Sequence, residues 1–301
     1  MKHLSPMQLR TLKLSGVLLS LIGLIACSGS SHQFPDIPNN PFLPYYIKLH
    51  PEGVRDSLER FMVYRDMIRQ IFLEEDLPVF LMALPALESG FRADAISPAG
   101  AGGLWQFMPQ TGTTFGLKSD EWMDERFDPV KSTRAAAKYL KKLYAQFQDW
   151  HQALTAYNAG EGRVQKALTT EQKHTMPAGY WKLELKAESR DYYPKFMALV
   201  HIFLDKDRAG FEEVRFEPEN ALASLNVPVL LSLEDVARRL NVPYTEIREF
   251  NSYLKQGKPA PGQTEYTLYL RKGQQTQLLE SLNKNPPLPA PAFTEKTTAR
   301  L

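Results

Sequence analysis

Hydrophobic residues recur at intervals of three and four along much of the chain, which is the period of an α-helix with one buried face. The clearest run follows Tyr45 and predicts a long helix buried through Leu58, Phe61, Met62, Met67, Ile68, Ile71 and Phe72. A second stripe follows Asp128-Pro129, a pair suited to a helix start because Asp caps the first turn and Pro fits its first position. Further helices are predicted at 150–159 and 189–206. With few strands expected before residue 222, the first two thirds are predicted to be mainly α.

A shorter helix is predicted from about Pro78 to Ser89. Pro85 should bend it or split it into two pieces, because proline lacks a backbone donor and clashes with the preceding turn. Gly90 suits the left-handed position just past a helix end. Residues 92–109, which are small and glycine-rich, are expected to form a loop.

The pattern changes after residue 222. Two β-prone segments, 227–231 and 266–270, flank two short helices that are predicted at 234–240 and 244–251. This β-α-α-β order predicts a small, separate α+β module over residues 222–283. The proline-rich residues 284–301 are expected to be a disordered tail.

The N-terminal residues have the charged start and short apolar run of a secretory signal, predicted over residues 1–26. The apolar run is shorter than the roughly 20 residues that span a bilayer. The four residues 24–27, Leu-Ile-Ala-Cys, look like a bacterial lipobox, which implies cleavage before Cys27 and its acylation. The alternative is an ordinary secretory signal with an incidental cysteine. Residues 27–44, rich in Ser, Pro and Asn, are expected to be a tether.

The composition narrows the function classes. Hydrophobic residues make up 43% of 301 residues, enough for a buried core, and 36 basic against 34 acidic residues give no indication of a nucleic-acid partner. The single cysteine excludes an intramolecular disulfide. The six histidines are scattered, so neither a metal ion nor a cofactor is expected.

Glu88 is the first candidate for chemistry. It lies near a predicted helix C-terminus, where the partial negative charge disfavours a carboxylate, among apolar residues such as Leu84, Leu87 and Phe91. Both effects raise the pKa of a carboxyl group. A carboxylic acid that stays protonated near neutral pH can protonate the leaving oxygen of a glycosidic bond.

Three further segments offer ligand-binding side chains. In the segment 102–109, Trp105 offers a flat face for a sugar ring and Gln106 offers an amide. In the segment 156–164, Asn158 either binds a polar ligand or caps a helix. Glu161 is the alternative acid, although it is expected to lie in a turn and to pair with Arg163. In the segment 188–195, a tyrosine hydroxyl can donate to Glu88.

The order and spacing of these segments resemble the lytic transglycosylase family, whose domain is similar to goose-type lysozyme. Four motifs carry the resemblance: Glu88-Ser89, Gly103-Leu104-Trp105-Gln106, Ala156-Tyr157-Asn158 and Glu188-Ser189-Arg190-Asp191-Tyr192. Ser189 stands where the family usually has Thr. The resemblance implies a lysozyme-like catalytic domain, expected here over residues 45–215.

The resemblance also implies a mechanism. Glu88 protonates the oxygen between N-acetylmuramic acid and N-acetylglucosamine, and then acts as base on the muramic 6-hydroxyl, which leaves a 1,6-anhydro end. No second carboxylate is an obvious partner, so the substrate's acetamido group stabilises the cation. Ser89, Trp105, Gln106, Tyr157 and Asn158 are the expected substrate-binding residues, and Tyr192 holds Glu88.

Two other functions remain open: a lysozyme-type hydrolase, in which water attacks, and an inactive, lipid-anchored wall-binding protein. The module at 222–283 resembles a degraded LysM repeat, and its role is either glycan binding or a structural cap. Peptidoglycan strands are the expected partner, with the membrane contacted through acylated Cys27. Ser28 after this cysteine implies the periplasmic face of a Gram-negative outer membrane. The oligomeric state is not predicted.

Overall fold

The computed structural model of the protein describes residues 39–171 and 186–284. The predicted signal peptide at 1–26 and the lipidation site Cys27 lie outside the described residues. So does the predicted tail, except for Lys284 at the end of a helix. Within the described chain, no helix is long and apolar enough to cross a membrane.

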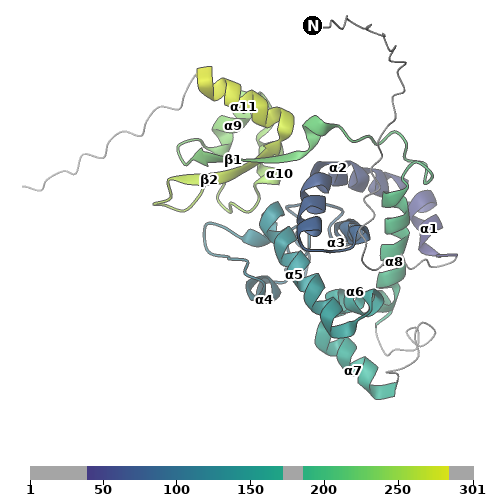
Figure 1. The fold of residues 1–301 in the computed structure, drawn as a ribbon. Coiled ribbons are helices and arrows are strands. Elements are labelled where there is room, and N and C mark those ends of the chain that lie inside the picture. Colours follow the sequence, from purple (N-terminus) through teal and green to yellow (C-terminus); the bar gives the residue numbers. More distant parts are fainter. Residues whose placement is uncertain (1–38, 172–185, 285–301) are drawn as a thin grey trace, which may run out of the picture. The chain divides into compact units, whose positions relative to one another are not determined.

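The described chain up to residue 204 is mainly helical, which confirms the predicted class (Figure 1). Its helices are α1 (Phe42–Pro44), α2 (Pro51–Glu74), α3 (Leu84–Glu88), α4 (Pro109–Thr114), α5 (Pro129–Phe147), α6 (Trp150–Ala159), α7 (Glu161–Glu171) and α8 (Ala187–Leu204). A π-helical turn, Tyr45–Leu49, joins α1 to α2, and 3-10 turns occur at Val79–Ala83, Glu125–Phe127 and Pro218–Asn220.

The predicted tether is partly folded. Its last residues form α1, and Asn40 is buried with its side-chain amide donating to the backbone oxygen of Pro194 at 2.8 Å. The prediction of a tether is therefore wrong from about residue 39. The fixed φ of proline is compatible with a helical turn as well as with an extended chain, and the buried Asn40 amide links this turn to α8.

The α2 helix buries the face that the hydrophobic pattern predicts. Leu58, Ile68 and Phe72 are fully buried in its middle. The ring of Phe61 lies 5.2 Å from the ring of Phe91 and 5.2 Å from that of Phe203, between ring centroids. This aromatic contact joins α2 to the end of α8 and to the turn that follows α3.

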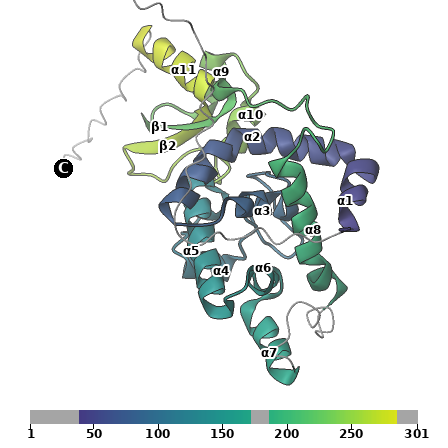
Figure 2. The same ribbon diagram turned by 45° about the vertical axis from the view of Figure 1, so that its right-hand side comes forward.

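The predicted helix 78–89 is split, as expected. A 3-10 turn, Val79–Ala83, is followed by α3, and Pro85 lies in the first turn of α3, where its missing donor costs nothing. The views from two directions place α3 among α2, α5, α6 and α8 (Figures 1 and 2). The short helix is therefore enclosed by longer ones, which fixes the position of its last residue, Glu88.

The C-terminal module has the predicted β-α-α-β order. Strands β1 (Leu222–Pro228) and β2 (Glu265–Arg271) are antiparallel, with Leu222 opposite Arg271. Helices α9 (Leu233–Leu240) and α10 (Tyr244–Phe250) connect them, and α11 (Lys272–Lys284) follows.

The first strand begins five residues before the predicted start, and α11 was not predicted. Ser224 and Asn226 are not β-prone, so the pairing with β2 rather than propensity makes this segment a strand. Ser232 ends the connection after β1 because its side chain caps α9 together with Asp235.

The C-terminal module packs directly onto the helical part, and the described residues 39–171 and 186–284 belong to one compact unit. Tyr64 of α2 is buried against Phe250 of α10, with ring centroids 6.3 Å apart. The hydroxyl of Tyr269 donates to Oδ1 of Asp128, the cap of α5, at 2.8 Å. The module thus shares a continuous hydrophobic core with the helices.

Candidate active site

Glu88 is the last residue of α3, and the chain turns sharply after it. Gly90 and Phe91 both have positive φ, +60° each, and the backbone N–H groups of Ser89 and Phe91 donate to the oxygen of Pro85. The backbone oxygen of Gly90 also accepts from Nε of Arg60 on α2 at 2.7 Å. Hydrogen bonds to α3 and to Arg60 of α2 therefore fix the turn. Glu88, at the start of the turn, is half-buried.

The Glu88 carboxyl group has a raised pKa of about 7. Burial is the largest cause, since it penalises the charged form. The hydroxyl of Tyr192, on α8, donates to Oε1 and lowers the pKa, which partly offsets burial. The charge of Glu188 raises it further. At neutral pH the group therefore holds its proton about half of the time, which suits both an acid and a base.

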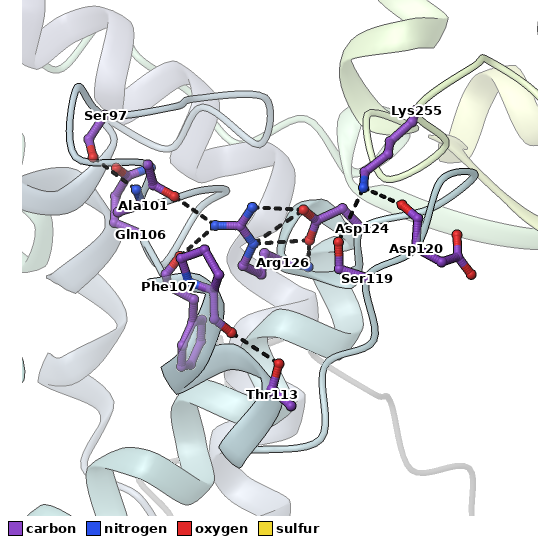
Figure 3. Close-up of polar contacts among 12 residues, drawn as sticks. Ser97, Ala101, Gln106, Phe107, Thr113, Ser119, Asp120, Asp124, Arg126 and Lys255 are labelled. Atoms are coloured by element: carbon purple, nitrogen blue, oxygen red, sulfur yellow. Dashed lines mark hydrogen bonds and ion pairs between the residues drawn. The ribbon is translucent and has the colours of Figure 1, made fainter.

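The loop 101–108 follows Glu88 in the chain and is built on glycine. Gly103 has φ +79°, and a Cβ at this position would overlap the backbone oxygen of Arg126. Gln106, with φ +49°, donates its amide to the backbone oxygens of Gly103 at 2.9 Å and Ala95 at 3.2 Å. Arg126 fastens the loop by donating to the oxygens of Gly100 and Phe107 (Figure 3).

Ser89 ties this loop to the Glu88 turn. Its hydroxyl is buried and donates to the backbone oxygen of Leu104 at 2.9 Å. The predicted substrate-binding role is therefore replaced in this structure by a bond within the protein. The physical reason is that the hydroxyl lies under the turn, facing the loop.

Trp105 does not lie where the sequence predicted. Its ring is fully buried, packs 5.8 Å from the ring of Phe72 and donates Nε1–H to the hydroxyl of Thr133 at 2.9 Å. No face of the indole is open to a sugar, so the prediction of stacking is wrong. An indole buries a large apolar area, and a hydroxyl on α5 satisfies its one polar atom.

The third motif meets the same loop. The hydroxyl of Tyr157, on α6, donates to the backbone oxygen of Trp105 at 2.7 Å. Burial raises the pKa of Tyr157 well above its ordinary value, and the charge of Glu88 adds to this. Asn158 is exposed, and its Oδ1 accepts from the hydroxyl of Ser189 at 3.1 Å. Within the part of the chain that the structure describes, no residue accepts from the Asn158 amide nitrogen, which can therefore donate to a ligand.

The structure thus connects all four predicted motifs. Tyr192 bonds to Glu88, Ser89 and Tyr157 bond to the loop, and Ser189 bonds to Asn158. These bonds link α3, the loop, α6 and α8.

Three other carboxylates of the helical part occupy different positions, and Glu161 is the one that the sequence offered as an alternative acid. Glu161 begins α7 and pairs with Lys142 at 2.7 Å rather than with Arg163, so both the predicted turn and the predicted pairing are wrong. Asp128 is buried as the cap of α5. Asp94 is exposed and lines a different cavity.

Three neighbours were not predicted: Arg60, Arg126 and Glu188. Glu188 opens the fourth motif, so its proximity to Glu88 could have been inferred from Tyr192, one helical turn further along α8. Arg60 and Arg126 act on backbone oxygens of distant segments, for which the sequence gives no signal. Within residues 39–171 and 186–284, no group of three or more His, Cys, Asp or Glu side chains is arranged to hold a metal ion.

Comparisons with known proteins place part of the chain in a domain family. Residues 73–176 match the model of the transglycosylase SLT domain family. The chain is 33% identical over 210 residues, 69% of its length, to "Membrane-bound lytic murein transglycosylase D" of Escherichia coli (strain K12), and it spans 46% of that protein. It is 32% identical over 117 residues, 36% of its length, to the "Soluble lytic murein transglycosylase" of the same strain, of which it spans 18%.

A solved structure, that of an inactive mutant of the lytic transglycosylase Slt from Pseudomonas aeruginosa, is 28% identical. The match covers 49% of this chain and 25% of that chain, with a TM-score of 0.42. The chain spans less than half the length of the relatives named here. Residues 73–176 therefore match a transglycosylase SLT domain, and the chain is similar in sequence to lytic murein transglycosylases.

Proposed function

We propose that the protein is a lytic transglycosylase. It cleaves the β-1,4 bond between N-acetylmuramic acid and N-acetylglucosamine in peptidoglycan and leaves 1,6-anhydro ends. The observation that supports this most is the Glu88 carboxyl group, half-buried, with one hydroxyl donor and a pKa near neutrality. The names of the homologous enzymes support the choice of substrate.

Glu88 acts twice in this mechanism. As an acid, its proton moves to the bridging oxygen while the bond to C1 of the muramic residue breaks. The substrate's acetamido group stabilises the positive charge at C1. As a carboxylate, Glu88 then takes the proton from the muramic 6-hydroxyl, whose oxygen bonds to C1. Glu88 is protonated again at the end, so protons balance and no water is consumed.

Neighbouring side chains prepare Glu88 for both steps. Tyr192 stabilises the carboxylate after the first proton transfer, because its hydroxyl already donates to Oε1. Asn158 and Tyr157 lie on α6 beside the loop, and we assign Asn158 to the substrate's acetamido or hydroxyl groups. Gln106, half-buried on the loop, contributes its amide oxygen, since its amide nitrogen already binds the protein.

The product distinguishes this function from hydrolysis. Purified sacculi are digested with the protein, and the released muropeptides are weighed by mass spectrometry. We expect anhydro-muropeptides, each one water lighter than the hydrolytic product. Products of hydrolytic mass would instead indicate a lysozyme-type hydrolase, and undigested sacculi an inactive wall-binding protein.

We further propose that the protein resides in the cell envelope, acylated at Cys27 and anchored on the periplasmic face of an outer membrane. The residues 24–27 and the membrane-bound relatives support this. Metabolic labelling with a palmitate analogue tests it: label incorporated by the wild type should be lost in Cys27→Ala. Label in the variant would contradict the assignment.

For the C-terminal module, we propose the role of a structural brace. Its contacts with the α5 cap and with the segment 122–124 support this more than its resemblance to a LysM repeat does. Tyr269 donates to Asp128, and the backbone oxygen of Tyr253 accepts from the N–H of Asp124 at 2.8 Å.

A further inference from the structure

A cavity of about 870 Å³ lies apart from the Glu88 constellation, where the segments after α3 and around Arg126 meet α10 and the residues that follow it. Its lining is rich in charge of both signs. On the helical part these charges are Asp94, Asp124 and Arg126, and on the C-terminal module they are Arg248, Glu249 and Lys255. Three acidic and three basic residues therefore surround one space.

Among these six charged residues, two form an ion pair with each other. Arg126 and Asp124 form a nearly buried ion pair at 2.7 Å (Figure 3). The remaining four form no ion pair with any described residue, which leaves an acidic pair, Asp94 and Glu249, and a basic pair, Arg248 and Lys255. Opposite charges that line one cavity without forming ion pairs are complementary to a ligand that carries both a positive and a negative charge.

The charge of the acidic pair is compensated only in part. Burial raises the pKa of Glu249, and the charge of Asp94 raises it further. Arg60 and Arg271 lower it from the side of a second cavity that Glu249 also lines. A ligand ammonium group between the two carboxylates would relieve their repulsion.

The basic pair is already oriented by the protein. Arg248 donates to the backbone oxygen of Asn251 at 3.0 Å, and the ammonium group of Lys255 bonds to the hydroxyl of Ser119 at 3.2 Å and the backbone oxygen of Asp120 (Figure 3). Lys255 also interacts with the nearby Asp120 carboxylate and lowers its pKa, although the two form no ion pair. No described carboxylate forms an ion pair with Arg248, and a ligand carboxylate would supply one.

The cavity is linked to the candidate active site by one loop. Ala95 accepts the amide of Gln106 through its backbone oxygen, while its neighbours Asp94 and Ile96 line the cavity. Ile96 is 70% exposed, which leaves an apolar side chain on the lining for contact with a ligand. The segment that holds the Gln106 side chain therefore also contributes residues to the lining of this cavity.

We infer that the cavity binds a short peptide that carries both an ammonium group and a carboxylate, with the former at the acidic pair and the latter at the basic pair. Resting on the proposed function, the ligand is the peptide stem of peptidoglycan, which contains a diamino acid and ends in a carboxylate. The C-terminal module then contributes half of a peptide site.

Calorimetry with the whole chain tests the inference. The probes are the free tetrapeptide L-alanyl-γ-D-glutamyl-diaminopimelyl-D-alanine and its derivative with the side-chain amine acetylated. Wild-type protein should bind the free peptide about fivefold more tightly than the acetylated peptide. This ratio corresponds to about 1 kcal/mol, the upper end of the range for one exposed ion pair. Asp94→Asn combined with Glu249→Gln should bind both peptides equally. Glu234→Gln, on the exposed side of α9, is the matched control and should keep the contrast.

The basic pair has its own test. Arg248→Gln should weaken binding of the free peptide, whereas Arg248→Lys should restore it, because the charge matters more than the bonds that Arg248 makes to the backbone. Equal binding of both peptides by the wild type, or a contrast that survives in the double variant, overturns the inference. Because titration needs no catalysis, it is repeated on Glu88→Gln. Hydrolytic products from sacculi would contradict the proposed transglycosylase reaction and leave this result standing.

Discussion

Glu88 and Asp128 are two carboxyl groups whose pKa is raised by burial, and they differ in what surrounds them. Asp128 caps the N-terminus of α5, where Oδ1 accepts from two backbone N–H groups and from the Tyr269 hydroxyl. Glu88 ends α3 and, among the described residues, has Tyr192 as its one hydrogen-bond donor. A helix N-terminus stabilises a carboxylate, and a C-terminus does not.

The comparison teaches that burial alone does not make a carboxyl group reactive. Asp128 is 1% exposed, but its oxygen is saturated by donors and stays fixed. Glu88 is less buried, with one donor and a pKa of about 7. We expect substitutions at the first group to change stability and substitutions around the second to change catalysis.

The largest expected effect is that of Glu88→Gln. Cleavage of sacculi should fall by at least about 10³-fold, because the amide keeps the shape and has no proton to give. The melting temperature, followed by circular dichroism, should not fall. Glu161→Gln is the matched control, because its partner is Lys142, and it should cleave at the wild-type rate. Activity retained in Glu88→Gln and lost in Glu161→Gln would reverse the assignment.

Tyr192→Phe should slow cleavage by about tenfold to a hundredfold, the range expected for one hydrogen bond to a charged group. Because the lost bond favoured the carboxylate, the pKa of Glu88 should rise, and the alkaline limb of the pH–rate profile should move to higher pH. The neighbouring Tyr193→Phe serves as control. An unshifted profile in Tyr192→Phe would mean that the hydroxyl has only a packing role.

Asp128→Ala should lower the free energy of unfolding by about 2–3 kcal/mol, because α5 loses its cap and the buried hydroxyl of Tyr269 loses its acceptor. Asp149→Ala removes the cap of α6, a single bond to the N–H of Gln152, and should cost about 1 kcal/mol. Urea unfolding measures both. Equal losses would show that Tyr269 contributes nothing at Asp128.

Tyr269→Phe should cost about 1 kcal/mol, the smallest effect of the set. The double variant Tyr269→Phe with Asp128→Ala shows whether the two side chains act together. If the module braces the α5 cap, the double variant should lose about 1 kcal/mol less unfolding free energy than the sum of the two single losses. Additive losses would remove the support for the brace.

Much of the fold follows from local patterns. The buried face of α2, the Asp128 cap, the split at Pro85 and the end of α6 at Gly160 each depend on residues close in sequence. The early start of β1 was missed because pairing with β2, forty residues away, determines it. For the same reason the sequence did not reveal that α2 and α10 share a core.

The sequence predicted which residues belong to the candidate site better than it predicted which way their side chains point. The motif order identified Glu88 and Tyr192, and the structure brings them together. Trp105 and Ser89 were expected to face the substrate, but both point into the protein. Trp105 lies in a glycine-rich loop and Ser89 in the turn after α3, and in neither segment does periodicity define which side is buried. The cavity beside Arg126 forms from segments more than a hundred residues apart and left no pattern in the sequence.

Glu88 is expected to retain its proton near neutral pH because partial burial disfavours its charge and Tyr192 is its one donor among the described residues. The direct measurement is the carboxyl ¹³C chemical shift of Glu88, followed against pH by NMR in the wild-type chain and assigned by its absence in Glu88→Gln. We predict a midpoint at about pH 7, so that the acid form falls from nearly complete at pH 5 to a small fraction at pH 9. A midpoint near the ordinary glutamate value of about 4.3 would contradict the account.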